Sequence, residues 1–315
     1  MNGSKHLANT IMMVRPHDFD FNEETGRDNE FQNRPIGDTS EVNALAMKEF
    51  SRMVAQIRAA GVDVMVLEKS HALGRLQAPD AVFPNNWFST EQDGTVLMYP
   101  MFAENRRAEK RMEDVENLLL ENNCFIKNVI HVGRPNEDEL ILEGTGSMII
   151  DHTNRNIYAA ISKRCHIDQF NNFMDLRGYN EGILFHTKSS NGQAIYHTNV
   201  MMSIADKFAV VCLESIYNDA ERKKVSSTLE KTHEMIDISI KQMERSFCGN
   251  ILQVRNNQGD PVTVMSQSAF EGFTDAQFDR IESYGKVVNT KINTIERIGG
   301  GSARCMMAEV FLPKL

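Results

Sequence analysis

The apolar residues of this sequence fall into short runs that alternate with stretches of helical spacing. Residues 11–14 form the first run and predict a buried strand. The first predicted helix begins near Thr39 and ends at Gly61, where a glycine can close the last turn. The residues expected on its apolar face are Val42, Leu45, Ala46, Met53 and Ile57. A run over residues 62–67 then predicts the next strand.

This alternation repeats along the whole chain. Helices are predicted to begin near residues 40, 106, 166, 219 and 275, a period of roughly 50 to 65 residues with two or three strands in each interval. A unit of that size cannot bury both faces of its own small sheet, so neighbouring units must cover each other. The pattern predicts a single α/β domain over residues 1–315, built as a closed ring of modules. An ordinary mixed α/β domain with fortuitous spacing is the alternative.

Composition and charge narrow the class of protein. Hydrophobic residues make up 41% of the 315 positions and charged residues 24%, as in folded proteins. The net charge is −9 and no block of Lys and Arg stands out, so binding to nucleic-acid phosphates is not expected. No stretch reaches the roughly 18 to 20 apolar residues of a membrane span, and no signal-peptide core follows the N-terminus. We therefore expect a cytoplasmic protein without nucleic-acid or membrane partners, for which a homo-oligomer is possible.

The cysteines are widely spaced and include no CxxC pair. They are Cys124, Cys165, Cys212, Cys248 and Cys305. A disulfide framework or a zinc ribbon needs closely spaced pairs, so we expect neither and at least one free thiol. Cys305 stands out because it follows the run Gly299–Gly301, whose missing side chains would leave the thiol unshielded. A thiolate in such a setting is a strong nucleophile, although a buried structural cysteine is the commoner use of this residue.

Other candidate chemical groups lie at the ends of predicted strands. Glu143 occurs in the motif LEGTGS, His197 in YHTN and Asn86 in FPNNW. A carboxylate and an imidazole beside a nucleophile can move protons. Taken one at a time, each motif also fits an ordinary turn or a structural histidine.

Taken together, the motifs resemble those of a known superfamily. FPNNW, LEGTGS, SKR, YHTN and GGGSARCM occur in this order between residues 83 and 306, and they are similar to motifs of the guanidino-group-modifying enzymes. This superfamily, the penteins, contains amidinotransferases, arginine deiminases and dimethylarginine hydrolases, and the chain most resembles its citrulline-hydrolysing branch. The resemblance implies a five-module, pseudo-symmetric α/β propeller of ββαβ-type repeats. It also implies an enzyme that needs no metal and no organic cofactor.

The resemblance assigns roles to single residues. It implies that Cys305 is the nucleophile, that His197 is the general acid and base, and that Glu143 orients the substrate nitrogens and shares the proton work. It places Arg164 and Arg107 at the substrate's α-carboxylate. That role fits a guanidinium, which pairs bidentately with a carboxylate.

Three asparagines complete the expected substrate site. Asn22 opens a polar segment over residues 22–32 that is too long for a simple turn. Where deiminases have aspartates that bracket a cationic guanidinium, this chain has Asn86 and Asn199. An amide offers one donor group and one acceptor instead, which suits a neutral ureido group. The expected substrate is therefore the amino acid citrulline, cleaved through a carbamoyl group on Cys305 to ornithine, ammonia and carbon dioxide.

Other functions use much of the same set of residues. An arginine dihydrolase or deiminase, or a dimethylarginine hydrolase, would act on a guanidinium, and an amidinotransferase would pass the amidine to a second amine. A non-catalytic binding protein with the same propeller is a fourth alternative. The joint presence of Cys305, His197 and Glu143 argues against it.

Overall fold

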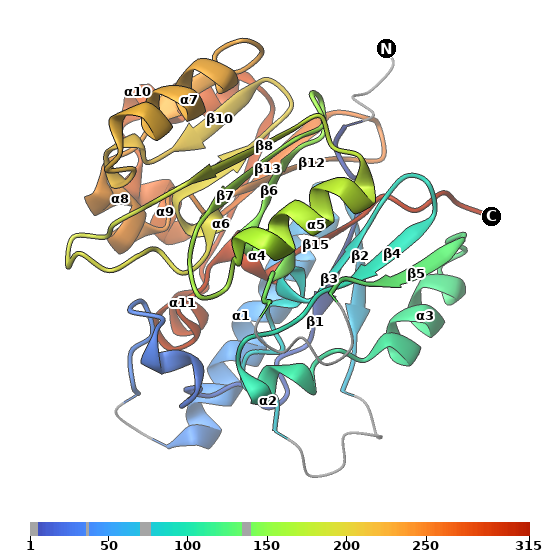
Figure 1. The fold of residues 1–315 in the computed structure, drawn as a ribbon. Coiled ribbons are helices and arrows are strands. Elements are labelled where there is room, and N and C mark those ends of the chain that lie inside the picture. Colours follow the sequence, from blue (N-terminus) through green and yellow to red (C-terminus); the bar gives the residue numbers. More distant parts are fainter. Residues whose placement is uncertain (1–5, 36–37, 70–76, 134–139) are drawn as a thin grey trace.

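The computed structural model describes residues 6–35, 38–69, 77–133 and 140–315. Within these residues the strands form five separate three-stranded sheets (Figure 1). The first sheet contains β15 (Ala308–Val310), β1 (Thr10–Val14) and β2 (Asp63–Leu67). The other sheets follow in chain order: β3 (Phe88–Thr90), β4 (Thr95–Met98) and β5 (Asn128–His131); β6 (Ile149–Asp151), β7 (Asn156–Ala160) and β8 (Glu181–Phe185); β9 (Met202–Ile204), β10 (Phe208–Val211) and β11 (Glu234–Asp237); β12 (Leu252–Arg255), β13 (Pro261–Ser266) and β14 (Lys286–Thr290).

Every sheet has the same connectivity. Its central strand pairs antiparallel with one neighbour and parallel with the other, and a helical segment joins the two parallel strands. These helices are α1 (Thr39–Ala59), α2 (Glu104–Arg107) with α3 (Met112–Glu121), α5 (Ile167–Arg177), α7 (Asp219–Leu229), and α9 (Gln267–Gly272) with α10 (Asp275–Ser283). The predicted α/β fold of five strand–strand–helix–strand modules is confirmed.

The two ends of the chain share the first module. Strand β1 pairs in parallel with β2, with Met12 opposite Met65, and antiparallel with β15, with Met12 opposite Ala308. Helix α1 of this module also contacts β14 of the last one. The ring is thus closed by segments that lie about 300 residues apart in the sequence.

Helix α1 shows how the sequence sets the helix position. The side chain of Asp38 caps its N-terminus by accepting a hydrogen bond from the backbone N–H of Ser40. Its buried side chains are Val42, Ala46, Phe50, Met53, Val54 and Ile57. The prediction was wrong for Leu45, which is 44% exposed. The buried stripe is centred near Phe50 and Met53, and Leu45 lies beyond its edge.

Two other predicted elements differ from the structure. The second helix is interrupted, because α2 ends at Arg107 and α3 begins only at Met112. The apolar run over residues 199–204 by itself predicts a strand, but its first part belongs to the helical turn α6 (Thr198–Met201), which precedes β9. A tertiary contact favours this turn, since the Thr198 hydroxyl donates a hydrogen bond to the backbone oxygen of Ser147, 2.6 Å away.

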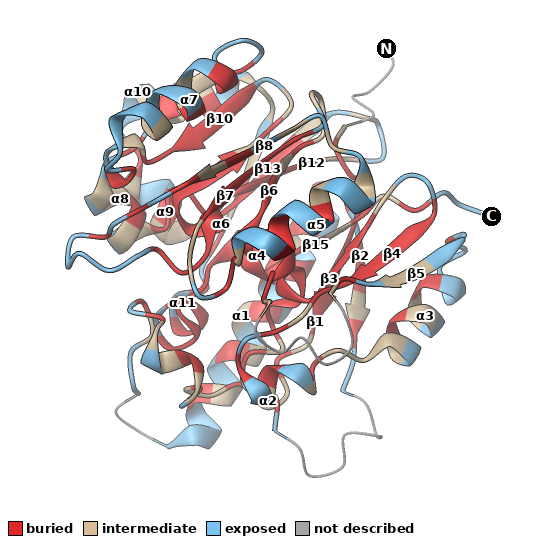
Figure 2. Cartoon of the chain, viewed as in Figure 1, coloured by how far each residue is buried: buried red, intermediate tan, exposed pale blue. Residues whose placement is uncertain are grey.

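The cores lie between the sheets and the helices that cover them. The strands are buried along most of their length, whereas the outward faces of α5, α7 and α10 are exposed (Figure 2). One cluster joins Met12 and Met65 of the first sheet to Phe88 and Met98 of the second. Among the described helices, none has the length and apolar character needed to cross a membrane.

Candidate active site

Four short helical turns, each just before the outer antiparallel strand of a module, meet in the interior of the ring. They are η3 (Pro84–Asn86), α4 (Gly144–Ser147), α6 and η5 (Ala303–Met306). Turn α4 contacts η3 and α6, and η3 contacts η5. In the fifth module the segment 248–251 has the same place, directly before β12. These turns bring together side chains from motifs that are far apart in the sequence.

Cys305 lies in η5 with its side chain buried, only 3% exposed. The glycine run does not expose the thiol as its sequence suggested. Gly300 has a φ of +63°, and a Cβ there would collide with Asn29, so this glycine allows the N-terminal segment to cover the loop. The Sγ atom accepts hydrogen bonds from Nδ2 of Asn199 (3.3 Å) and of Asn250 (3.2 Å). Burial raises the pKa of the Cys305 thiol, and hydrogen bonds to the sulfur oppose this rise.

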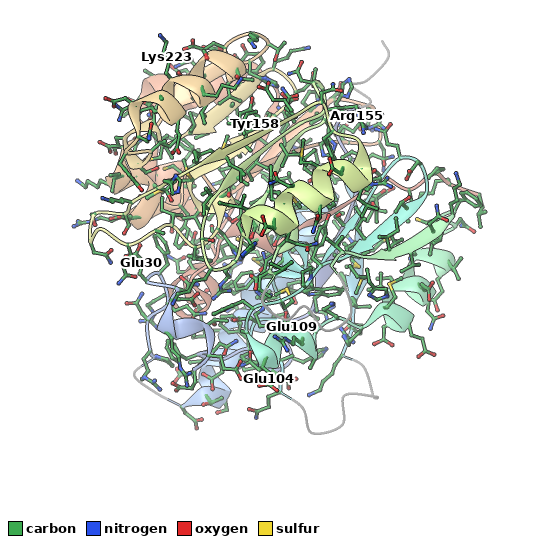
Figure 3. All side chains as sticks on the ribbon, in the orientation of Figure 1. Glu30, Glu104, Glu109, Arg155, Tyr158 and Lys223 are labelled. Atoms are coloured by element: carbon green, nitrogen blue, oxygen red, sulfur yellow. The ribbon has the colours of Figure 1, made fainter. Side chains whose placement is uncertain are left out.

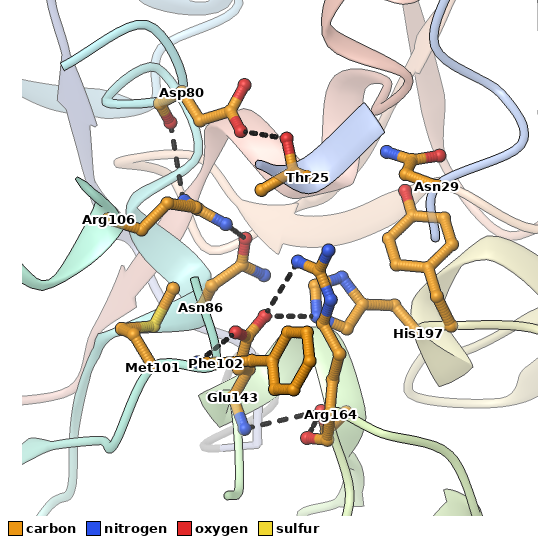
Figure 4. Close-up of polar contacts among 12 residues, drawn as sticks. Thr25, Asn29, Asp80, Asn86, Met101, Phe102, Arg106, Glu143, Arg164 and His197 are labelled. Atoms are coloured by element: carbon orange, nitrogen blue, oxygen red, sulfur yellow. Dashed lines mark hydrogen bonds and ion pairs between the residues drawn. The ribbon is translucent and has the colours of Figure 1, made fainter. Parts of the chain in front are cut away.

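Glu143 and His197 form a buried hydrogen-bonded pair (Figure 4). Nε2 of His197 lies 2.7 Å from Oε2 of Glu143. The same oxygen accepts a hydrogen bond from Nη1 of Arg164 (3.3 Å), and Oε1 accepts one from the backbone N–H of Phe102 (2.9 Å). Glu143 and His197 occupy the N-cap positions of α4 and α6, so the two turns fix their directions.

The surroundings of Glu143 and His197 shift the pKa of each group and so decide which of the two is charged. Burial by itself would raise the pKa of the Glu143 carboxyl, but the charge of Arg164 and the contact with His197 hold this pKa well below its usual range. Burial lowers the pKa of His197, although Glu143 acts in the opposite direction. The pair therefore consists of a carboxylate and a neutral imidazole that can accept a proton.

Arg164 is buried between two carboxylates of the protein. Its Nε and Nη2 atoms donate to Asp28 at 3.2 and 2.7 Å, and Nη1 donates to Glu143. The rings of Phe102 and Tyr196 lie 5.8 and 5.4 Å from the guanidinium carbon. The bidentate face expected to bind a substrate carboxylate is thus occupied by Asp28 in this structure.

Asn86 is held by an arginine that the sequence did not single out. Its Oδ1 atom accepts a hydrogen bond from Nη1 of Arg106 at 2.8 Å, and its Nδ2 atom donates to Oδ1 of Asn85 at 3.1 Å. The other side of the Arg106 guanidinium is paired with Glu109, through Nη2 at 2.8 Å. All four side chains are buried.

The N-terminal segment contributes Asn22 to a neighbouring cluster around Asp80. Oδ2 of Asp80 accepts hydrogen bonds from Nδ2 of Asn22 (2.7 Å) and from the hydroxyl of Thr25 (2.8 Å), as Figure 4 shows for Thr25. Oδ1 of Asp80 is buried and has no hydrogen-bond partner among the described residues. Burial raises the pKa of Asp80. This open acceptor lies next to Arg106, whose Nη2 atom donates to the backbone oxygen of Asp80.

The structure brings most predicted site residues into contact and leaves one outside. Asn199 contacts Cys305, and Glu143 links His197 to Arg164. Arg107 is instead exposed, with Nε donating to the backbone oxygen of Met101 at 3.2 Å. The arginine beside Asn86 is its neighbour in the sequence, Arg106.

Sequence reasoning missed three contributors: Asp28, Arg106 and Asn250. Asp28 lies within the polar segment 22–32 that the sequence singled out, but nothing in the sequence marks it within that segment, and Arg106 carries no signal of its own. For Asn250 a signal exists in the module period, because one polar residue per module recurs at a spacing of ~55 residues. The recurring residues are Asn86, Glu143, His197, Asn250 and Cys305.

The arrangement combines a thiol, an imidazole–carboxylate pair and several fixed amides. Such a set can attack a planar, electrophilic carbon and move protons to and from its substituents. Within the described residues no group of His, Cys, Asp and Glu side chains is arranged to hold a metal ion. Cysteine nucleophiles use this combination of groups.

Comparison with protein-family models decides the family. Residues 15–312 match the model of the eukaryotic N,N dimethylarginine dimethylhydrolases. The chain belongs to this family. It is thus a hydrolase of the guanidino-group-modifying superfamily, the penteins, as the motifs implied. A search of curated proteins found no match.

Solved structures of low sequence identity share the fold of this pentein hydrolase. The N-terminal domain of ArgZ, covalently bound to a reaction intermediate, has a TM-score of 0.70 at 15% identity and covers 96% of this chain and 99% of its own. Full-length ArgZ, a cyanobacterial arginine dihydrolase, has a TM-score of 0.71 at 15% identity over 97% of this chain, which spans only 41% of ArgZ. The dimethylarginine hydrolase of Pseudomonas aeruginosa, complexed with citrulline, has a TM-score of 0.65 at 13% identity, with 96% and 100% coverage. These likenesses support the five-module pentein fold.

Proposed function

We propose that this pentein hydrolase cleaves the ureido group of citrulline and releases ornithine, ammonia and carbon dioxide. The observation that carries the proposal is the orientation of the Asn86 amide. A guanidinium only donates hydrogen bonds, so Arg106 at 2.8 Å fixes Oδ1 of Asn86 towards itself. The Nδ2 donor then faces away from Arg106. It lies close to Gly146, as the His197 ring does, because a Cβ added at Gly146 would meet both groups.

A ureido group complements this arrangement. Its carbonyl oxygen can accept from Nδ2 of Asn86, and its N–H groups can donate to Glu143 and to Oδ1 of Asn199. That Asn199 oxygen is buried and has no partner among the described residues. A guanidinium carries only donors, so it would set N–H groups against the N–H groups of Asn86.

The proposed reaction begins when the Cys305 thiol gives its proton to the neutral imidazole of His197 and the resulting thiolate attacks the ureido carbon. The bond between this carbon and the ornithine nitrogen breaks as His197 gives a proton to the leaving amine, which leaves a carbamoyl thioester on Cys305. His197 then accepts a proton from a water molecule that attacks the thioester carbon. The S–C bond breaks, the thiolate is restored, and the released carbamate decomposes to ammonia and carbon dioxide.

Binding of the substrate's α-carboxylate by Arg164 requires an exchange of partners. Asp28 occupies Nε and Nη2 of Arg164, so the substrate carboxylate would have to take its place. Arg164 would keep its contact with Glu143 through Nη1. Asn22 is retained as a substrate-side residue because it fixes Asp80, whose open oxygen can accept from a substrate ammonium.

A second candidate is hydrolysis of a dimethylated arginine, because the matching family model carries that name. Its guanidinium is cationic, so carboxylates rather than amides would be the favourable partners around the reacting carbon. In this structure the side chains that donate hydrogen bonds to the thiol sulfur are amides, Asn199 and Asn250. We therefore place this candidate, and arginine dihydrolase activity, below citrulline hydrolysis.

The test compares kcat/KM for citrulline, arginine and N,N-dimethylarginine in the wild type and in Asn86→Asp. The aspartate keeps an acceptor for Arg106 but replaces the Nδ2 donor with an oxygen. We expect the wild type to prefer citrulline. In the variant, kcat/KM for citrulline should fall roughly 10- to 100-fold, as expected when a buried hydrogen bond becomes a repulsive pair, and the citrulline-to-arginine ratio should fall with it.

Two variants serve as controls. Asn172→Asp makes the same change at an exposed position of α5 and should behave as the wild type, and Cys305→Ser should be inactive towards every substrate. A wild type that prefers arginine or dimethylarginine would overturn the proposal and identify the alternative. So would an Asn86→Asp variant whose preference moves towards citrulline.

A further inference from the structure

Asn250 has the position in the fifth module that the catalytic turns have in the other four. It lies between α8 (Ile240–Ser246) and β12, and its side chain is fully buried. The segment 248–251 packs closely against α6, because a Cβ on Gly249 would collide with the backbone of Val200 and Met201. None of the motifs found in the sequence includes this asparagine.

Three polar groups of Asn250 are engaged around Cys305. Nδ2 donates to Sγ of Cys305 at 3.2 Å and to the backbone oxygen of Asn199 at 2.7 Å. Oδ1 accepts from the backbone N–H of Cys305 at 3.4 Å, and the backbone oxygen accepts from the N–H of Arg304 at 3.3 Å. An N–H only donates, so the amide cannot be reversed without losing this contact. The Asn250 donor therefore faces the sulfur.

The charged and titratable groups near the sulfur are directed elsewhere. The Arg304 guanidinium donates to the backbone oxygen of Met307 and to Glu309. Nε2 of His197 is paired with Glu143, and the Tyr196 hydroxyl donates to the backbone oxygen of Gly300. Over the described ranges, no hydrogen bond joins the sulfur to a cationic side chain.

We propose that Asn250 is a catalytic residue that, together with Asn199, holds the Cys305 thiolate through neutral amide N–H groups. A buried anion needs hydrogen-bond donors to replace the water it has lost. Two amides on one sulfur provide these donors without a direct ion pair to an imidazolium. This arrangement suits a neutral substrate, which brings no positive charge of its own to the thiolate. The inference does not depend on the identity of the substrate, since it concerns the free enzyme.

The test is the pH dependence of Cys305 alkylation by iodoacetamide without substrate. Mass spectrometry of the Cys305 peptide separates its signal from those of the other cysteines. Asn250→Ala removes the donor without adding charge, and Asn250→Asp keeps the acceptor for the Cys305 N–H but replaces the donor. In both variants the apparent pKa should rise by at least about one unit, so that labelling near neutral pH slows about tenfold or more.

Asn172→Asp is the matched control and should label as the wild type does. Folded Asn250 variants, judged by circular dichroism and melting temperature, with an unchanged labelling profile would overturn the proposal. If neither Asn250 variant folds, labelling of a variant that keeps Asn250 tests the proposal instead. In His197→Ala the apparent pKa of Cys305 should stay within roughly half a unit of wild type. A rise of about one unit or more there would show that an imidazolium holds the thiolate, and Asn250 would lose the proposed role.

Discussion

At the scale of single residues, the partners of each site group decide its ionisation. Glu143 is completely buried, yet it stays a carboxylate because Arg164 and His197 contact it directly. An unpartnered carboxyl in the same place would become neutral. The residue that sets this balance, Arg164, is in turn fixed by Asp28, which lies more than a hundred positions away in the sequence.

This balance predicts how stability depends on pH. The pKa of Glu143 is lower in the folded than in the unfolded chain, so the unfolded chain binds the proton first as the pH falls. The stabilising contribution is therefore present above the unfolded pKa of about 4.3 and is lost progressively below about pH 5. Between pH 5 and pH 4, Glu143→Gln should lose less stability than the wild type, by about 0.5 kcal/mol, because the unfolded glutamate is only partly protonated in this range.

Urea unfolding at a series of pH values measures this slope. Glu104→Gln is the control, because Glu104 is exposed at the margin of the molecule (Figure 3), and it should follow the wild type. Equal slopes for Glu143→Gln and wild type would mean that Glu143 does not hold its charge in the folded protein.

At the scale of elements, the short turns before the antiparallel strands position the chemistry. Turn α4 carries Glu143 at its N-cap and has two glycines where it meets its neighbours. A Cβ on Gly144 would lie 2.5 Å from the backbone oxygen of Asn85, so η3 and α4 can approach only because this side chain is missing. At Gly146 a Cβ would meet Nδ2 of Asn86 and lie 3.1 Å from the ring of His197.

Gly146→Ala should therefore damage activity more than stability. The added methyl group would displace the Asn86 amide and the His197 ring, and we expect kcat to fall at least about 100-fold, as for other misplacements of catalytic groups. Gly182→Ala is the comparison. Its Cβ would collide with Phe170 and Met174, which are not part of the candidate site. That variant should lower the melting temperature and leave kcat close to wild type. Equal kcat values for the two variants would contradict this role of Gly146.

At the scale of the whole molecule, the ring depends on pairing between the two ends of the described chain. Strand β15 supplies the antiparallel partner of β1, and it also touches the second module through β3. The Thr90 hydroxyl donates to the backbone oxygen of Glu309 and accepts from the N–H of Phe311. The segment that follows Cys305 therefore joins the first two modules.

Deletion of residues 308–315 should abolish cooperative folding. It would expose the edge of β1 and the apolar cluster beneath it, which contains Ala308, Val310 and Leu312. Deletion of residues 314–315 alone is the control and should change the melting temperature by only a few degrees. Calorimetry of both proteins measures the effect, and a single sharp transition near the wild-type temperature in the longer deletion would show that the ring closes without β15.

The sequence by itself determined the repeat and the superfamily, and it singled out the main residues of the candidate site. Helix caps, apolar stripes and glycines act over a few neighbouring positions, so the module period and the motifs around Cys305, His197 and Glu143 were visible without a structure. Only the tertiary structure decided which groups surround them. Asp28 on Arg164, Arg106 on Asn86 and Asn250 on Cys305 are contacts between distant segments. Local sequence patterns carry no information about such contacts. The direction and the burial of these side chains are set only when the distant segments pack together in the closed ring.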